Sequence, residues 1–437
     1  MRLLIAGTAS GCGKTTASLL VMAALQLRGL TVAPCKVGPD YIDPGFHRVV
    51  CGRPSENLDT FLTDSADIPW LMQNDADITV IEGVMGYYDG MDSLTMRCSA
   101  WELACLTQTP VILVVDASGG AASVAAQVKG FQTLRDESHI AGVLVNRVSG
   151  EHHYALVKEA VAHYTDLPCV GYLTKDTALT FPSRHLGLIP ADELPDVRQR
   201  IFEAAQKALD TLDLDLMLSL AAQAPSLIAP EKHFPMRASY RLGIAKDEAF
   251  SFYYNANLRV LCAMGFELIP FSPLHDAELP QGLDGLYLGG GFPEVFAQQL
   301  ASNTSMLSSI RHALDSGIAC YAECGGMMYL CKAINGIPMV EFLPALCLMT
   351  KRLQRFGYVQ VTHESGLTFP AHEFHHSVTD PIGNVHYAYH VEKASNTEKT
   401  WICGMTKGHT LAGYAHLHFL SHPELVDLLW PPKEEQA

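Results

Sequence analysis

Residues 3–16, LLIAGTASGCGKTT, decide the fold of the N-terminal part of this chain. An apolar run that predicts a buried strand leads into a glycine-rich turn, and residues 14–28 then predict an apolar helix that ends at Gly29. The glycines let successive backbone N–H groups point inward, and the helix N-terminus adds its dipole, so the turn suits the phosphates of a nucleotide. The candidate ATP-binding residues are Gly11, Gly13, Lys14, Thr15 and Thr16. Lys14 would reach the outer phosphates, and the hydroxyl of Thr15 or Thr16 would bind Mg²⁺.

This turn departs from the strict phosphate-loop pattern GxxxxGK[ST], because Thr8 occupies the first glycine position and Gly7 lies one residue earlier. A plain glycine-rich turn is the alternative interpretation. The order of strand, turn and helix favours the phosphate site, since each lies where the mechanism needs it.

Further apolar runs along the chain alternate with helical stretches. Residues 30–35, 78–81, 111–115 and 142–145 predict buried strands. Strands separated by helices predict βαβ units and a parallel sheet, which makes this an α/β protein. Ligands of such sheets bind at the carboxyl ends of strands, and polar residues follow the strand ends here: Lys36, Glu82, Asp116 and Asn146.

A change of pattern divides the chain into domains. A helical stretch over 193–220 leads into residues 224–235, which hold three prolines in twelve residues. A second α/β pattern begins at Arg241, with strands expected at 267–270, 285–288 and 318–321. We therefore expect an N-terminal domain over 1–192, a helical and proline-rich linker over 193–238, and a C-terminal domain over 239–437.

The C-terminal domain contains a candidate nucleophile. Cys324 follows the predicted strand in IACYAECGG, residues 318–326, and two glycines come next. A cysteine at a sharp strand-to-helix turn is the thiol counterpart of the serine nucleophile elbow. We expect the turn to expose the sulfur and the helix N-terminus to lower its pKa. The glycine-rich turn with Gly290 and Gly291 predicts an oxyanion hole.

The general base is harder to choose, because the chain has 19 histidines. The segment around His416 resembles the Tyr-x-His turn of class I glutamine amidotransferases of the corrin branch. In the ordinary class I triad a glutamate stands two residues further on, where this chain has His418. The third triad member therefore stays open, a Cys–His dyad included, and His372 and His375 are alternative bases.

The composition excludes several classes of protein. A formal net charge of −16 argues against nonspecific nucleic-acid binding. No apolar run is long enough for a membrane span or a signal sequence, and twelve irregularly spaced cysteines indicate reduced thiols. We expect a cytoplasmic protein with no membrane partner; the sequence leaves open whether it forms a homodimer.

The phosphate loop also resembles that of dethiobiotin synthetase, an enzyme that phosphorylates a carboxylate. By context, Asp59 and Glu82 match the magnesium ligands of that family, and Asn146 matches its adenine-reading residue. A solvated loop acid is the alternative for Asp59 or Glu82, and a plain turn for Asn146.

Taken as a whole, the chain resembles the cobyrinic acid a,c-diamide synthase family over residues 1–425. The matching motifs are KVGPDYIDPGFH at 36–47, EGVMGYYDG at 82–90, PSRHLG at 182–187, GGGFPE at 289–294, HEFH at 372–375 and HLHF at 416–419. Two small departures are Tyr87, where leucine is commoner, and Ala371, where glycine is commoner.

The resemblance implies roles for the first half of the chain. Asp43 and Asp89 would act in catalysis, and Asp40, Tyr41 and Ile42 would bind the substrate. Lys36 and Arg184 would join the ATP site, and Thr15, Asp59 and Glu82 would hold Mg²⁺. For Asp40 and Asp43 turn formation in a proline-flanked loop is the alternative role.

The implied reaction amidates the a and c carboxylates of a corrin with ATP and glutamine. Cys324 would release ammonia from glutamine, and ATP with Mg²⁺ would convert a corrin carboxylate to an acyl phosphate that ammonia displaces. Hydrogenobyrinic acid and nickel-sirohydrochlorin are alternative substrates. A noncatalytic partitioning or scaffold protein is the remote alternative, which the presence of both Cys324 and His416 disfavours.

Overall fold

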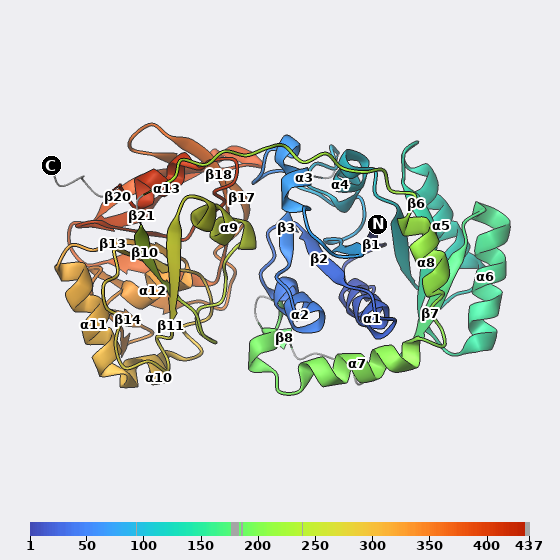
Figure 1. The fold of residues 1–437 in the computed structure, drawn as a ribbon, viewed down its shortest axis with the longest axis horizontal. Coiled ribbons are helices and arrows are strands. Elements are labelled where there is room, and N and C mark those ends of the chain that lie inside the picture. The colour runs from blue at the N-terminus through green and yellow to red at the C-terminus, as the bar shows by residue number, and fades with distance from the viewer. Residues whose placement is uncertain (93, 176–182, 185–186, 238, 433–437) are drawn as a thin grey trace. The chain divides into compact units, whose positions relative to one another are not determined.

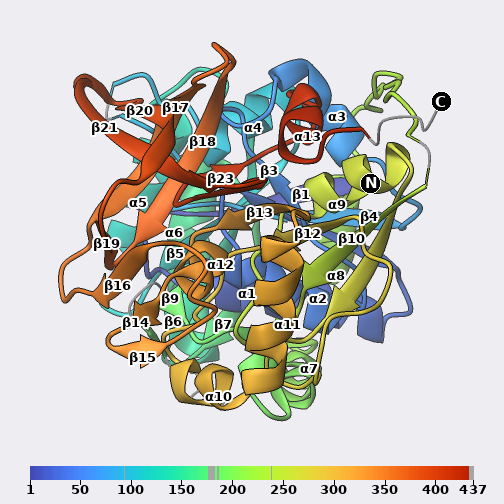
Figure 2. The ribbon, with the colours of Figure 1, turned by 90° about the vertical axis from the view of Figure 1, so that its left-hand side faces the viewer.

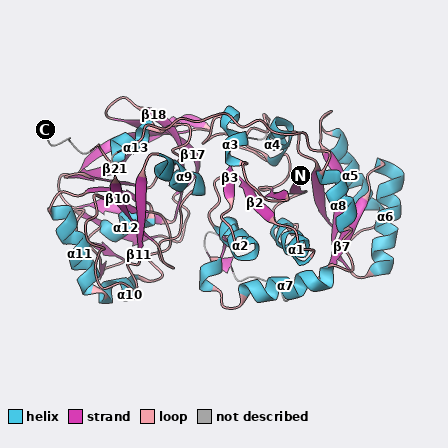
Figure 3. Cartoon of the chain, viewed as in Figure 1, coloured by secondary structure: helices cyan, strands magenta, loops and turns pink. Residues whose placement is uncertain are grey.

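The computed structural model describes residues 1–92, 94–175, 183–184, 187–237 and 239–432. The chain forms two compact units, Met1–Glu231 and Lys232–Ala437. Helices flank strands in both units (Figure 3), so the predicted α/β class is confirmed. Within the described ranges, no helix combines the length and the hydrophobicity needed to cross a bilayer.

The first unit is built on a parallel sheet of seven strands in the order β3-β2-β4-β1-β5-β6-β7 (Figure 1). Its strands are nearly continuous buried runs, as expected of a sheet covered on both faces. All the strands predicted in this half are present. The strands are β1 Arg2–Gly7, β2 Val32–Val37, β3 Glu56–Leu58, β4 Ile78–Glu82, β5 Val111–Asp116, β6 Ile140–Val148 and β7 Cys169–Thr174.

One face of this sheet is covered by four helices that share an apolar core. They are α1 Lys14–Leu27, α2 Ile42–Cys51, α7 Val197–Ala208 and α8 Leu214–Ala221. The unit also contains α3 Ile68–Leu71, α4 Ala100–Thr107, α5 Ala122–Thr133, α6 Glu151–Thr165 and the short pair β8 Ser183–Arg184 and β9 Gly187–Leu188.

Helices α7 and α8 correct the expected domain boundary. Residues 193–238 were expected to form a linker, but Ile201, Ala205 and Met217 are buried in the core of the first unit. The amphipathic pattern of these helices reflects packing against α1 and the sheet, and the unit ends at Glu231. The proline-rich stretch alone lies at the boundary.

The second unit has a sheet of ten strands in the order β11-β10-β12-β13-β22-β21-β20-β17-β18-β23. The first five are parallel: β10 Tyr240–Ala245, β11 Phe266–Phe271, β12 Gly285–Leu288, β13 Ala319–Glu323 and β22 Thr410–Gly413. The helices are α9 Asn255–Ala263, α10 Ala297–Ser302, α11 Thr304–Asp315, α12 Gly325–Leu330 and α13 Glu424–Leu429.

An antiparallel extension completes this sheet and was not predicted. It consists of β17 Arg355–His363, β18 Thr368–His375, β20 His386–Lys393, β21 Asn396–Lys407 and β23 His416–Leu417. Figure 2 shows the long strands of this extension gathered on one side of the unit, away from α10 and α11. A small separate sheet contains β14 Ala333–Ile334, β15 Ile337–Pro338, β16 Ala345–Met349 and β19 Ser377–Pro381.

Candidate active sites

Cys324 lies on a strained turn between β13 and α12. Its backbone has φ 45° and ψ −100°, a conformation that non-glycine residues rarely adopt. A Cβ on Gly325 would lie 2.9 Å from the backbone nitrogen of Gly291, and one on Gly326 would lie 2.1 Å from the carbonyl oxygen of Leu288. The two glycines therefore let the elbow lie against the predicted oxyanion turn.

The thiol itself is buried, which contradicts the expected exposure and lowered pKa. Burial raises the pKa of Cys324, and the nearby carboxylate of Glu294 raises it further. Helix α12 has only six residues, so its N-terminus offsets little of this effect. The thiol thus needs a base to remove its proton.

His416 is held by a carboxylate that sequence reasoning missed. Its Nδ1 donates to Oε2 of Glu323 at 3.3 Å, and Oε1 of Glu323 accepts the backbone N–H of Leu417 at 3.1 Å. Both side chains are buried. A Cβ on Gly290 would lie 2.7 Å from Cε1 of His416, so the ring lies against the oxyanion turn. The only available signal was that Glu323 ends the strand just before the nucleophile.

The other candidate histidines have different surroundings. Burial lowers the pKa of His418 to about 3, and its ring packs on Tyr254 with centroids 5.3 Å apart. His372 lies opposite His416 across the β18–β23 ladder, and burial together with His416 lowers its pKa to about 3. His375 stacks on Tyr414 with centroids 3.6 Å apart.

In the first unit, the phosphate loop closes on the N-terminus of α1. Gly13 adopts φ 98°, and a Cβ there would lie 2.1 Å from Nδ2 of Asn146. That amide donates to the carbonyl oxygen of Cys12 at 2.8 Å, so Asn146 supports the loop. Lys14 donates to the carbonyl oxygen of Ala9 at 3.0 Å, and burial, with Lys36 nearby, lowers its pKa.

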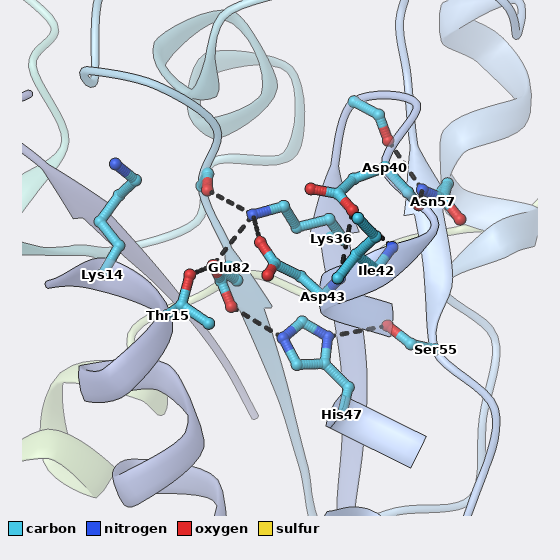
Figure 4. A network of polar contacts seen from close by, with 12 residues as sticks. Lys14, Thr15, Lys36, Asp40, Ile42, Asp43, His47, Ser55, Asn57 and Glu82 are labelled. Carbon is cyan, nitrogen blue, oxygen red and sulfur yellow. Dashed lines mark hydrogen bonds and ion pairs between the residues drawn. The ribbon is translucent and has the colours of Figure 1, made fainter. Parts of the chain in front are cut away.

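A buried charge cluster lies beside this loop (Figure 4). Nζ of Lys36 donates to Oδ2 of Asp43 at 2.6 Å and to Oε1 of Glu82 at 2.9 Å. The Thr15 hydroxyl donates to the same Oε1 at 2.7 Å. The parallel register of β2 and β4 sets Lys36 opposite Glu82. Three predicted site segments therefore meet at the carboxyl edge of the sheet.

The charges within this cluster shift the pKa values of its own side chains. Burial opposes ionisation of Glu82, but Lys36 and His47 outweigh it and lower the pKa of this carboxyl. Burial and the charge of Glu82 raise the pKa of Asp43 well above its usual value. Burial opposes the charge of Lys36, yet Asp43 and Glu82 raise its pKa overall. One carboxylate is thus firmly ionised and the other is easily protonated.

His47 is a second residue to which sequence reasoning gave no role. Its Nε2 donates to Oε2 of Glu82 at 2.8 Å, and its Nδ1 lies 3.0 Å from Oγ of Ser55. It stands four residues after Asp43 on α2, so both side chains face the cluster. That i, i+4 spacing was the available signal.

The remaining predicted residues have mainly local contacts. Oδ1 of Asp40 accepts the backbone N–H groups of Ile42 at 2.8 Å and Asp43 at 3.1 Å, at the start of α2, whose cap residue is Tyr41. Oδ2 of Asp89 accepts the N–H of Gly86 at 2.9 Å.

Asp59, Thr16 and Arg184 complete the predicted set. Oδ1 of the buried Asp59 accepts the N–H groups of Phe61 and Leu62, both at 2.9 Å. Thr16 is half-buried in the first turn of α1. Arg184 belongs to β8, and its side chain lies outside the described residues.

The donor set beside the loop fits a hard divalent cation. Mg²⁺ prefers carboxylate and hydroxyl oxygens together with nucleotide phosphates. The hydroxyl of Thr15 and the ionised carboxylate of Glu82 already contact each other next to the phosphate loop. These two side chains would hold the ion.

Fold and sites together define a two-unit enzyme that combines a nucleotide-binding half with a glutamine amidotransferase half. Residues 3–189 match the model of the CobQ/CobB/MinD/ParA nucleotide binding domain, and residues 241–424 match the CobB/CobQ-like glutamine amidotransferase domain.

Curated relatives cover nearly the whole chain. Cobyrinate a,c-diamide synthase of Listeria innocua is 41% identical over 97% of this chain and 98% of its own length. The proteins of the same name from Caldanaerobacter subterraneus and Salmonella typhimurium are each 41% identical over 97% of this chain and 96% of their own length. The chain belongs to the cobyrinate a,c-diamide synthase family, whose members are glutamine-hydrolysing ligases.

Proposed function

We propose that this enzyme amidates the a and c acetate carboxylates of cobyrinic acid, with ATP and glutamine as co-substrates. The names of its relatives and the two matched domains support this reaction. The two halves of the reaction are assigned to separate units, because each unit carries one set of reactive groups.

In the second unit, Cys324 attacks the side-chain carbonyl of glutamine. His416 takes the thiol proton and later gives it to the departing ammonia, while Glu323 orients the ring and stabilises its charged form. The N–H groups of Gly290 and Gly291 hold the developing oxyanion. Because burial raises the thiol pKa, proton removal by His416 coincides with attack. Water then hydrolyses the thioester.

In the first unit, the acceptor carboxylate is activated as an acyl phosphate. The backbone N–H groups of the loop and the Lys14 side chain bind the phosphates; Thr15 and Glu82 would hold Mg²⁺, which when bound would supply positive charge beside the phosphates. Lys36 stabilises charge on the transferred group, and Asp43 and Asp89 orient the acceptor. Asp59 and Arg184 complete the metal and ATP sites, and Asn146 reads the base. Asp40, Tyr41 and Ile42 contact the corrin.

The observation that carries the proposal is the cluster of Thr15, Lys36, Asp43 and Glu82 beside the phosphate loop, in which Lys36 and Glu82 are buried. A structural ion pair needs only one acid for Lys36. Here a second acid has a raised pKa and lies at the sheet edge where ligands bind. This arrangement suits a site that receives a phosphate group and a carboxylate.

The test is a reconstitution with purified enzyme, ATP, Mg²⁺ and glutamine. Cobyrinic acid, hydrogenobyrinic acid and nickel-sirohydrochlorin are supplied separately, and the products are resolved by chromatography and mass spectrometry. We expect a diamide from cobyrinic acid, formed through a monoamide. Efficient turnover of another tetrapyrrole alone would reassign the substrate, and ATP hydrolysis without amide formation would reject the ligase assignment.

A further inference from the structure

Two buried acceptor atoms in the second unit face each other without a hydrogen bond between them. Glu373 and His375 are two residues apart on β18, so their side chains share one face of the strand. Oε2 of Glu373 and Nε2 of His375 are 3.9 Å apart, which is beyond hydrogen-bond distance. Among the described residues neither atom has a hydrogen-bond partner, and both side chains are more than nine-tenths buried.

The hydrogen bonds made by the other polar atoms of the two side chains show that these two atoms are acceptors. Nδ1 of His375 lies 2.8 Å from the carbonyl oxygen of Ser377, and a carbonyl only accepts, so Nδ1 carries a proton. In the neutral ring Nε2 is therefore an acceptor. The other carboxylate oxygen of Glu373 accepts from Nε1 of Trp401 at 3.4 Å. Two buried acceptors without a donor are costly, so the pair favours a small ligand with two N–H or O–H groups.

The pair lies next to the glutaminase residues. The ring of His375 stacks on Tyr414, with centroids 3.6 Å apart and planes inclined by 6°. The backbone N–H of Cys324 donates to the carbonyl oxygen of Gly413 at 2.7 Å, and Gly413 directly precedes Tyr414 in the chain. Strand β18 is also the ladder partner of β23, the strand of His416. The acceptor pair thus stacks on a residue next to the backbone partner of Cys324 and belongs to the strand that pairs with the strand of His416.

We propose that Oε2 of Glu373 and Nε2 of His375 form a binding site for ammonia released at Cys324. The proposal deepens the proposed function and rests on it, because ammonia must leave the thiol to reach an acyl phosphate. Ammonia has the donors that both atoms lack, and two hydrogen bonds of about 2.9 Å span the gap. It binds there as the neutral molecule NH3, because neither acceptor atom carries a proton to transfer, and it leaves with no covalent bond formed or broken.

The test measures how well glutamine hydrolysis is coupled to amide formation in Glu373→Gln. The new amide nitrogen can donate to Nε2 of His375 with almost unchanged shape, which closes the site. We expect glutamate release close to that of wild type, and a yield of corrin amide per glutamate that falls about tenfold. Synthesis driven by ammonium chloride should be unchanged. His375→Gln is the second variant, and Glu398→Gln on an exposed part of β21 is the matched control.

Each other outcome overturns the assignment. Normal coupling in both variants would show that water or nothing occupies the pair. Loss of glutamate release, with ammonium-driven synthesis retained, would place the pair in glutamine hydrolysis instead. If wild-type enzyme forms no amide even from ammonium chloride, the proposed function fails, and the ammonia site fails with it. The wild-type control therefore separates the two failures.

Discussion

Replacing Glu323 with glutamine tests whether the glutaminase site is a triad or a dyad. The carboxylate is buried at the end of β13, with one oxygen on His416 and the other on the N–H of Leu417. Glutamine has nearly the same shape, so its side-chain oxygen can keep one of these bonds. What the variant loses is the negative charge beside an imidazole that becomes positive when it takes the thiol proton.

The distance sets the size of the expected effect. Nδ1 of His416 and Oε2 of Glu323 are 3.3 Å apart. Two unit charges at this distance interact by about 5 kcal/mol at an effective dielectric constant of about 20. Because the imidazolium exists only once the thiol is deprotonated, the loss falls on the transition state and corresponds to about 5,000-fold in rate. The retained hydrogen bond offsets part of this, so we expect a decrease of about 10²- to 10³-fold.

The assay compares glutamate release with ammonium-driven amide synthesis in the same preparation. Glu323→Gln should lose the first activity and keep the second, because the phosphate site lies in the other unit. Glu398→Gln, exposed on β21, is the control for a change of charge alone. Glutamate release within about threefold of wild type would refute the argument and leave Cys324 and His416 as a dyad.

Three further predictions concern the nucleophile, the synthetase residues and the effect of acid. Cys324→Ser should abolish glutamine-driven amidation but not ammonium-driven amidation, whereas Lys14→Ala should stop both; parallel assays with each nitrogen source distinguish them. Glu82→Gln should slow both amidations, and Asp89→Asn should let a monoamide accumulate, followed as a chromatographic time course; diamide formation at normal rate in both would reject the site. Burial lowers the pKa of His418 to about 3, so the unfolded chain takes up its proton first. Above about pH 6.5 the ring is neutral in both states, and as the pH falls from there towards 3 the stability of the fold should decline, because only the unfolded chain binds the proton. His418→Gln should make urea unfolding midpoints less dependent on pH over this range; an unchanged dependence would contradict this.

Most of the parallel strands could be predicted because they are apolar runs that need no partner to be recognised, although β7 and β22 were not predicted. Residues 111–115, for example, give β5 almost to its ends. Strand β3 was missed because it is three residues long and two of them, Glu56 and Asn57, are polar. The antiparallel extension was missed because its faces alternate, and each strand gains its buried side only from neighbours distant in sequence.

The site residues also divide into those that stand in a local sequence pattern and those that only a distant contact reveals. Lys14 and Cys324 stand in local patterns, a loop before a helix and an elbow after a strand, so sequence alone indicated them. Glu323 and His47 contact partners 93 and 35 residues away, and no local pattern records such a contact. The burial of the thiol was equally hidden, because it depends on how the elbow packs against the turn at Gly291.

Both units contain the same pairing of a buried glutamate with a histidine, although the chemistry proposed for each unit differs. In each, a buried glutamate ends a parallel strand and holds a histidine from elsewhere: Glu82 with His47 at 2.8 Å, and Glu323 with His416 at 3.3 Å. The two pairs differ in what contacts the second carboxylate oxygen of the glutamate. A backbone N–H on Glu323 leaves its charge directed at the histidine, which suits proton transfer. On Glu82 the second oxygen faces a hydroxyl and an ammonium group, so its charge is directed at cations, and this suits phosphoryl transfer. We therefore propose that the histidine is the reacting group in one unit and a support for the carboxylate in the other.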